Sequence, residues 1–142
     1  MVTFLRYWGP VCVYAGIIFY FSSLSHPEEH LPFVSHFSDK VLHAVEYAVL
    51  GALCLRAFHG TLSVSWRQWA SPMAVVLASL YGASDEVHQS FVPFRYSHVL
   101  DWVADTVGAV IGVVTMRWML SLWPVNSVPE ALQEPRSNEM SS

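Results

Sequence analysis

Charged residues are scarce in this chain of 142 residues, because Asp, Glu, Lys and Arg together make up only 13% of it. A soluble domain carries about 25% charged residues. Hydrophobic residues, in contrast, make up 54% of the chain, and the mean hydropathy is +0.39. Few charges combined with long apolar segments argue against an ordinary soluble domain and predict an integral membrane protein.

Basic residues and cysteines are also few. Eleven acids outnumber seven Lys and Arg, and the formal net charge is −4, so nucleic acid is not an expected partner. Cys12 and Cys54 both fall within apolar segments, where they are expected to act as small buried hydrophobic residues. Neither a disulfide nor a cysteine-based metal site is therefore expected.

Four apolar segments are long enough to cross a bilayer as helices, given a rise of about 1.5 Å per residue. The predicted helices are residues 7–25, 41–59, 69–89 and 99–123. Ser23-Leu24-Ser25 is a poor cleavage site, so we expect the first segment to be a retained helix and not a removed signal. The predicted fold is all-α, an integral membrane up-down bundle of four transmembrane helices within one domain, residues 1–123. Residues 124–142 are rich in Pro, Ser, Glu and Asn and are predicted to be a disordered tail.

The distribution of Lys and Arg predicts how the bundle is oriented in the membrane. One side holds Arg6, Arg56, Arg67, Arg117 and Arg136. The other side holds only Lys40 and Arg95. Since positive residues favour the cytoplasm, we expect a multi-pass protein of the cell membrane with both termini cytoplasmic.

The polar residues in and beside the spans are predicted to gather at one membrane face. In an up-down bundle the second and fourth helices begin where the third ends. Those places hold Asp39, Lys40, His43, Glu46, Asp85, Glu86, His88, Gln89, Arg95, Asp101 and Asp105. Because a charge that faces lipid costs several kcal/mol, we expect these side chains to face one another.

Helical spacing places many of these residues on three stripes, one on each helix. The stripes are His43 and Glu46; Asp85, His88 and Gln89; and Asp101 and Asp105. The third stripe continues into Gly108 and Gly112, a GxxxG pattern that lets another helix approach closely. The same pattern could also support an oligomer.

The electrostatics of this region indicate a binding function. Six carboxylates would share it with only two fixed cations, Lys40 and Arg95. Like charges cannot all stay ionised at close range in a poorly solvated pocket, so we expect bound protons, protonated histidines or a bound cation. A divalent metal is one candidate, with His43, His88 and Asp85 as ligands. No other cofactor is expected, and the alternative for His43 is a structural hydrogen-bond network between helices.

Other residues also have two interpretations. Arg95 could hold a phosphate or carboxylate of a ligand, or it could form a salt bridge with a neighbouring acid. Asp39 and Asp101 could contact a ligand, or they could stabilise helix N-termini.

Three motifs resemble one known family. They are Ser84–Pro93 with Arg95, Asp101, Asp105 and Gly112; Asp39-Lys40-x-x-His43-x-x-Glu46-Tyr47-x-x-x-Gly51; and, more weakly, Ile18-Phe19 with Ser22-Ser23. Together they cover about residues 15–115 and resemble the VanZ-like family of small bacterial membrane proteins. In one departure, Phe94 stands where members usually have Gly, and we expect it to stiffen the loop and re-aim Arg95.

The resemblance implies a multi-spanning protein of the bacterial cell envelope and inner membrane. The family's namesake is linked to low-level resistance to the glycopeptide teicoplanin. We therefore expect binding of a lipid-linked cell-wall intermediate or a glycopeptide at the outer face, with a possible contribution to antibiotic resistance. Ligand-binding candidates are Asp39, Lys40, Glu46, Gln89, Arg95, Asp101 and Asp105.

Two other functions remain open. The alternative is a membrane-embedded, metal-dependent enzyme that acts on a lipid headgroup, with His43, Asp85, Glu86 and His88 as candidate catalytic residues. A small transporter is less favoured, because four helices are few for a transport path.

Overall fold

The computed structural model of the protein describes residues 2–25, 38–95 and 97–122. Within these ranges the chain forms four α-helices, one 3₁₀-helix and no strand. The elements are α1 (Val2–Ser22), α3 (Asp39–Thr61), η2 (Val64–Trp69), α4 (Ala70–Gln89) and α5 (Val99–Leu122). The prediction of an all-α fold is thus confirmed for the part of the chain that is described. The predicted tail, residues 124–142, lies outside it.

The observed helices follow the apolar segments with modest shifts at their ends. α1 begins and ends earlier than the predicted span of residues 7–25. α3 is longer than expected at both ends. The carboxylate of Asp39 stabilises its first turn, and the Thr61 hydroxyl donates a hydrogen bond to the backbone carbonyl of Ala57 in its last turn. η2 lies largely in the gap between the predicted helices 41–59 and 69–89.

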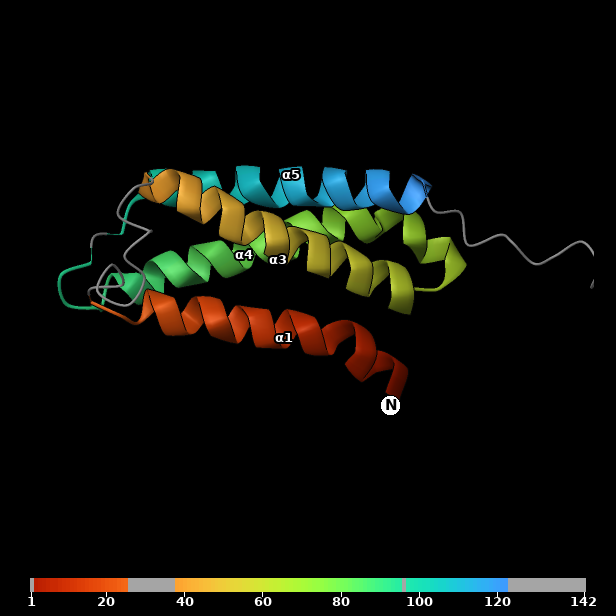
Figure 1. Ribbon diagram of the computed structural model, residues 1–142, viewed down its shortest axis with the longest axis horizontal. Helices are drawn as coiled ribbons and strands as arrows, with labels where there is room; N and C mark the ends of the chain where they lie inside the picture. Colours follow the sequence, from red (N-terminus) through yellow and green to blue (C-terminus); the bar gives the residue numbers. More distant parts are fainter. Residues whose placement is uncertain (1, 26–37, 96, 123–142) are drawn as a thin grey trace, which may run out of the picture.

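The helices lie side by side, with their ends collected at two opposite ends of the molecule (Figure 1). At one end α3 and α5 begin and α1 and α4 finish. The N-terminus and the last residues of α5 lie at the other end. α3 packs most extensively against α5, and it also contacts α4 and α1. α3 is therefore the central helix.

Small residues allow α3 and α5 to approach closely. A Cβ atom added to Gly108 or Gly112 would overlap the backbone of Ala44 or Ala48 on α3. In the opposite direction, a Cβ on Gly51 would lie 2.6 Å from the carbonyl oxygen of Ala109. The GxxxG stripe is thus covered by a helix of the same chain, and its predicted use in an oligomer stays a prediction.

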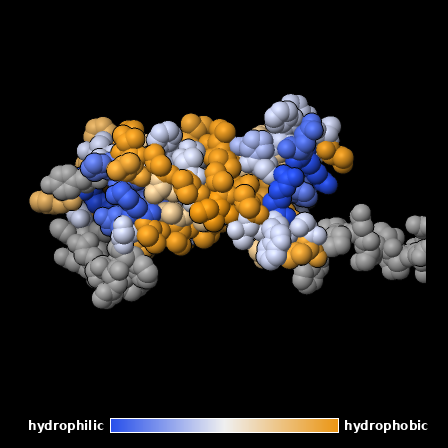
Figure 2. Space-filling model, turned by 90° about the horizontal axis from the view of Figure 1, so that it is seen from above, coloured by the Kyte–Doolittle hydropathy of each residue, from blue (hydrophilic) through white to orange (hydrophobic). Residues whose placement is uncertain are grey.

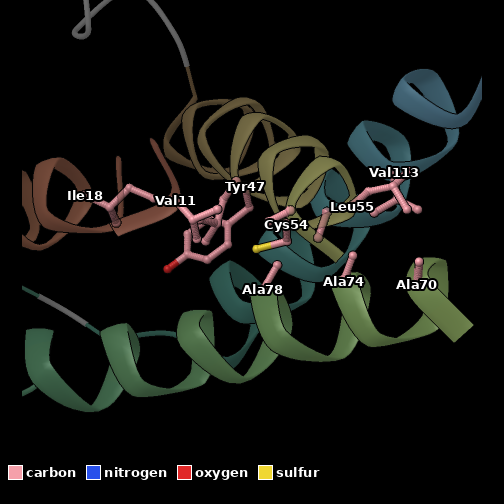
Figure 3. Close-up of a cluster of buried hydrophobic side chains, with 12 residues drawn as sticks. Val11, Ile18, Tyr47, Cys54, Leu55, Ala70, Ala74, Ala78 and Val113 are labelled. Carbon is pink, nitrogen blue, oxygen red and sulfur yellow. The ribbon is translucent and has the colours of Figure 1, made fainter. Parts of the chain in front are cut away.

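The apolar core lies between α3 and its neighbours (Figure 3). Tyr47 and Leu55 of α3 are almost fully buried, as is Cys54. Ala70, Ala74 and Ala78 recur every fourth residue on α4 and line its face toward this core. Cys54 meets the expectation of burial, whereas Cys12 is exposed on α1 and that expectation was wrong for it.

Many large apolar side chains point outward and form a hydrophobic belt between two hydrophilic ends (Figure 2). They include Val13 and Ile17 of α1, Val45 and Val49 of α3, Val76 and Leu80 of α4, and Val107, Ile111 and Val114 of α5. Among the residues that the structure describes, three helices, α1, α3 and α5, are long and apolar enough to cross a membrane. α4 is not among them, because its last turns carry Asp85, Glu86, His88 and Gln89.

A Gly112→Ala substitution tests the close contact between α3 and α5. We expect a loss of about 1–3 kcal/mol in stability, because the added methyl group meets backbone that cannot rotate away. Thermal unfolding of the purified protein in detergent measures the effect. Gly16→Ala is the matched control, since nothing lies within 4 Å of a Cβ there, and it should be neutral or slightly stabilising. Equal melting temperatures for the two variants would contradict the packing described.

Candidate functional site

A group of buried and half-buried polar side chains lies at the end of the molecule where α3 and α5 begin. We call it the polar cluster, and it consists of Ser22, His43, Glu46, Asp85, Glu86, Gln89, Asp101 and Asp105. Four different helices contribute these residues. Each side chain comes from the first turns of α3 or α5, or from the last turns of α1 or α4.

The His43–Asp105 pair joins α3 to α5. The Nδ1 atom of His43 lies 2.9 Å from Oδ1 of Asp105. Asp105 is fully buried, and the His43 side chain is only 12% exposed. A hydrogen bond to Nδ1 fixes the orientation of the imidazole ring and leaves Nε2 for another partner.

A second set of hydrogen bonds joins α1 to α4. Ser22 donates to Oδ2 of Asp85 over 2.8 Å, and the Gln89 amide donates to the same oxygen over 2.9 Å. The Gln89 amide also lies 3.3 Å from the Ser22 hydroxyl oxygen. All three side chains are buried. One carboxylate oxygen therefore holds the ends of two helices together.

The remaining acids of the polar cluster link it to the loop before α5 and to the surface. Glu86 accepts a hydrogen bond of 2.9 Å from the backbone N–H of His98 through Oε2. Asp101 lies at the outer edge, where Nζ of Lys40 is 3.6 Å from its Oδ1. Glu46 is close enough to His43, Asp85 and Asp105 for their charges to act on it.

Several buried oxygens in the polar cluster have no hydrogen-bond partner among the described residues. They are Oδ1 of Asp85, Oε1 of Glu86, Oδ1 of Asp101 and Oδ2 of Asp105, and the buried hydroxyl of Tyr47 also lacks one. A buried polar group without a partner costs about 1–3 kcal/mol, and more when the group is charged. Such groups in a folded protein call for an explanation, and buried acceptors without partners fit a ligand that supplies donors or positive charge.

Three residues of the polar cluster could hold a metal ion. One ligand atom each from His43, Glu86 and Asp105 can be chosen so that all three lie within 4.8 Å of one another. Imidazole nitrogen and carboxylate oxygen are suitable ligands for Zn²⁺ and for other divalent metals. The set predicted from the sequence contained His43, His88 and Asp85. The structure instead brings His43 together with Glu86 of α4 and Asp105 of α5.

His88 and Asp39 lie outside this buried group. His88 is half-buried, stacks on Phe19 with ring centroids 4.5 Å apart, and shares a 3.0 Å hydrogen bond with the Ser23 hydroxyl. Like Asp85, it contacts the end of α1, but its partner is the exposed Ser23 instead of the buried Ser22. Asp39 is exposed in the first turn of α3, where a carboxylate favours the helix N-terminus.

Arg95 and Phe94 form the edge of the site beyond α4. The Arg95 charge acts on Glu46, and its buried Nε atom has no hydrogen-bond partner in the described residues. Phe94 has φ = 64°, in the left-handed region that glycine adopts freely and bulky residues rarely occupy. This explains why a glycine suits the position. The strained backbone lies directly before Arg95, and its expected effect on the direction of this side chain stays a prediction.

Sequence reasoning assigned no role to two residues that shape the polar cluster. Ser22 was noticed only within a weak motif, although a serine pair near the end of an apolar helix could have marked a contact with a buried acid. Gly82 is the second, because a Cβ there would lie 2.8 Å from Oδ2 of Asp105. Its position one turn before Glu86 gave no signal, since only the approach of α5 makes the missing side chain necessary.

A comparison with family models gives one match. The model described as VanZ/LLP1 matches residues 11–121, which is most of the chain. The chain belongs to the VanZ-like family. No curated protein and no solved structure matches it. The resemblance noted in the sequence is thus confirmed, and with its three span-like helices the chain is a VanZ-like membrane protein.

A pair of neighbouring serines tests the link between α1 and α4. Ser22→Ala removes the hydroxyl donor from the buried Asp85, so we expect a loss of about 1–3 kcal/mol in stability. Ser23→Ala is the control, because Ser23 is exposed and should contribute less than about 1 kcal/mol. Thermal unfolding in detergent compares them. If Ser23→Ala proves the more damaging change, the role given to Ser22 is wrong.

The backbone strain at Phe94 gives a separate prediction. Phe94→Gly places the residue that the left-handed conformation favours at this position. We expect the melting temperature to rise, by an amount equivalent to about 1 kcal/mol, since strain of this kind costs about 1–3 kcal/mol and the more flexible unfolded chain offsets part of the gain. Phe94→Ala is the control and should not stabilise, because alanine keeps a Cβ. A gain of the same size in both variants would show that backbone strain is not the cause.

Proposed function

We propose that this VanZ-like protein is a four-span, up-down bundle of the bacterial cell membrane, with both termini in the cytoplasm. α4 would be the fourth span: it has 20 residues, about 30 Å of helix, and it carries exposed Val76 and Leu80 on the same belt as the other helices. Five arginines against Lys40 and Arg95 support this orientation. The polar cluster would then open at the outer face.

At this face we propose that the polar cluster binds an envelope ligand, either a lipid-linked cell-wall intermediate or a glycopeptide. The observation that carries this proposal is the set of buried carboxylate oxygens without partners on Asp85, Glu86 and Asp105. Sugar hydroxyls, amides and amines would donate hydrogen bonds to them. Isolated charges at membrane depth are costly, so their retention in the core of the bundle favours a binding role.

The two cations at the rim would complete the recognition. Lys40 is more than half exposed beside Asp101, and Arg95 lies on the loop that follows α4. An anionic group of the ligand, such as the phosphates of a lipid-linked precursor, would contact them while the hydrogen-bond donors enter between the helices. Arginine suits this position because its planar guanidinium can make paired hydrogen bonds to a phosphate.

Binding of two probes tests this function. The wild-type protein in phosphatidylcholine nanodiscs is titrated with a lipid-linked cell-wall precursor and, separately, with teicoplanin. We expect Arg95→Ala and Glu86→Gln each to weaken binding by about tenfold for whichever probe the wild-type protein binds, because each substitution removes a charged hydrogen-bond partner. Arg117→Ala is the control, since Arg117 lies on the last turns of α5 at the other end of the bundle.

Circular dichroism of each variant verifies that the helices are intact. Absence of binding of both probes to the wild-type protein would contradict the proposed ligand class. Equal weakening by Arg95→Ala and Arg117→Ala would show that net charge, and not the site, determines binding.

The alternative function is a metal-dependent enzyme that acts on a lipid headgroup. The arrangement of His43, Glu86 and Asp105 favours it, because their ligand atoms lie close enough for one ion. A divalent ion bound there would act as a Lewis acid on a headgroup oxygen. Asp85 directly precedes Glu86, and its Oδ1, which has no hydrogen-bond partner among the described residues, would accept a proton.

Metal content separates the two functions. Protein equilibrated with Zn²⁺ and then desalted should retain one ion per chain, as measured by elemental analysis, if the alternative holds. His43→Gln and Asp105→Asn should then lose the ion. His88→Gln should retain it, because His88 does not belong to the group that converges. A metal-free wild-type protein that still binds its ligand would exclude the metalloenzyme.

A further inference from the structure

A second pocket lies at the opposite end of the molecule, away from the polar cluster. Its volume is about 840 Å³, and residues of all five elements line it. Its basic lining residues are Arg6 of α1, Arg56 and His59 of α3, Arg67 of η2 and Arg117 of α5. This basic pocket holds four of the six arginines in the chain, and Figure 2 shows strongly hydrophilic residues gathered at this end.

No carboxylate lines the basic pocket among the described residues. The described acids begin with Asp39 at the start of α3 and end with Asp105 on α5, all in or beside the polar cluster. From Asp105 to Arg117 α5 rises about 18 Å, so the acids are too far away for ion pairs with these arginines. Four guanidinium groups around one concavity repel one another, and an anion bound between them would offset this repulsion.

Two of the arginines are positioned by neutral groups. The guanidinium carbon of Arg56 lies 5.3 Å from the centre of the Tyr7 ring, a cation–π arrangement. Tyr7 in turn packs against Gly60, where any side chain would overlap the ring. Nη1 of Arg117 lies 3.4 Å from the Ser71 hydroxyl oxygen. These contacts orient the arginines without neutralising them, so their charge remains for a ligand.

The rest of the lining is apolar. Leu55, Met116 and Leu120 border the same pocket, and the hydrophobic belt begins beside it (Figure 2). A pocket that combines several arginines with an apolar wall matches an amphiphile whose phosphate lies at the membrane surface and whose chains lie in the bilayer. Basic pockets between transmembrane helices on the cytoplasmic side bind anionic headgroups in this way.

We infer that the basic pocket binds a phosphate-bearing anion, with the headgroup of an anionic phospholipid as the source that its apolar wall favours. Arg67 and Arg117 are exposed and would contact the phosphate directly. Arg56, held on Tyr7, would contact it from the side of α3. The bound lipid would bridge α1, α3, η2 and α5 at this end.

Native mass spectrometry of the full chain tests this inference. The protein is released from phosphatidylcholine nanodiscs with and without phosphatidylglycerol, and the retained lipids are counted. We expect selective retention of phosphatidylglycerol and about a fivefold loss on Arg117→Gln, given about 1 kcal/mol for each basic residue near an anionic surface. Lys40→Gln removes one positive charge from an exposed side chain at the opposite end of the bundle, and it should change retention less than about twofold.

A second arm distinguishes the two sources of phosphate. Inorganic phosphate is titrated into the protein in pure phosphatidylcholine nanodiscs and into the sample that retains phosphatidylglycerol. Displacement of the lipid by millimolar phosphate would support a soluble phosphate ligand, whereas retention of the lipid would support the headgroup.

Three outcomes would overturn the inference. The first is equal retention of phosphatidylglycerol and phosphatidylcholine together with no binding of phosphate. The second is an equal loss for Arg117→Gln and Lys40→Gln. The third is an unchanged retention in Arg117→Gln and in the double variant Arg67→Gln/Arg117→Gln. Circular dichroism verifies that the variants are folded. Because the side chains of Arg67 and Arg117 are exposed, we expect their substitution to reduce lipid retention without unfolding the protein.

Discussion

The burial of carboxylates between helices is the constraint on which this structure depends. A carboxylate inside an apolar bundle is tolerated only when hydrogen bonds or positive charge compensate the lost hydration. Asp105 and Asp85 satisfy this condition by contacts to other helices, through His43 on α3 and Ser22 on α1. The acids therefore fix how the ends of the helices meet, and the small residues between α3 and α5 allow the helices to come close enough for those contacts.

The two ends of the bundle are chemically opposite, and this polarity organises the proposed functions. One end buries acids, some of whose oxygens have no partner among the described residues, while the other presents arginines around an open pocket. The middle is an apolar belt with few polar side chains (Figure 2). A ligand at the outer face and an anionic lipid at the inner face would thus bind at separate places, which the bundle connects through α3 and α5.

The strained backbone at Phe94 belongs to the loop that carries Arg95. Loops that aim a functional side chain often hold backbone in sparsely populated regions, because the surrounding structure fixes them there. Phe94 keeps φ = 64° without being a glycine, immediately between a proline turn and Arg95. The sequence indicated a departure from the family pattern at this residue. The structure identifies the backbone conformation that the usual glycine serves.

Much of the fold could be predicted from the sequence, because the length of an apolar segment and the positions of charges along it determine local structure. The helices, the membrane character, the grouping of polar residues on three stripes and the close approach at Gly108 and Gly112 could all be predicted from spacing. Tertiary packing alone decided which polar residues became partners. His43 pairs with Asp105 across α3 and α5. Asp85 and His88 of α4 instead contact neighbouring serines at the end of α1. Helical spacing gives the angle of a side chain around its own helix, but the neighbour it meets depends on the rotation and depth of a second helix, which are set by packing along the whole interface.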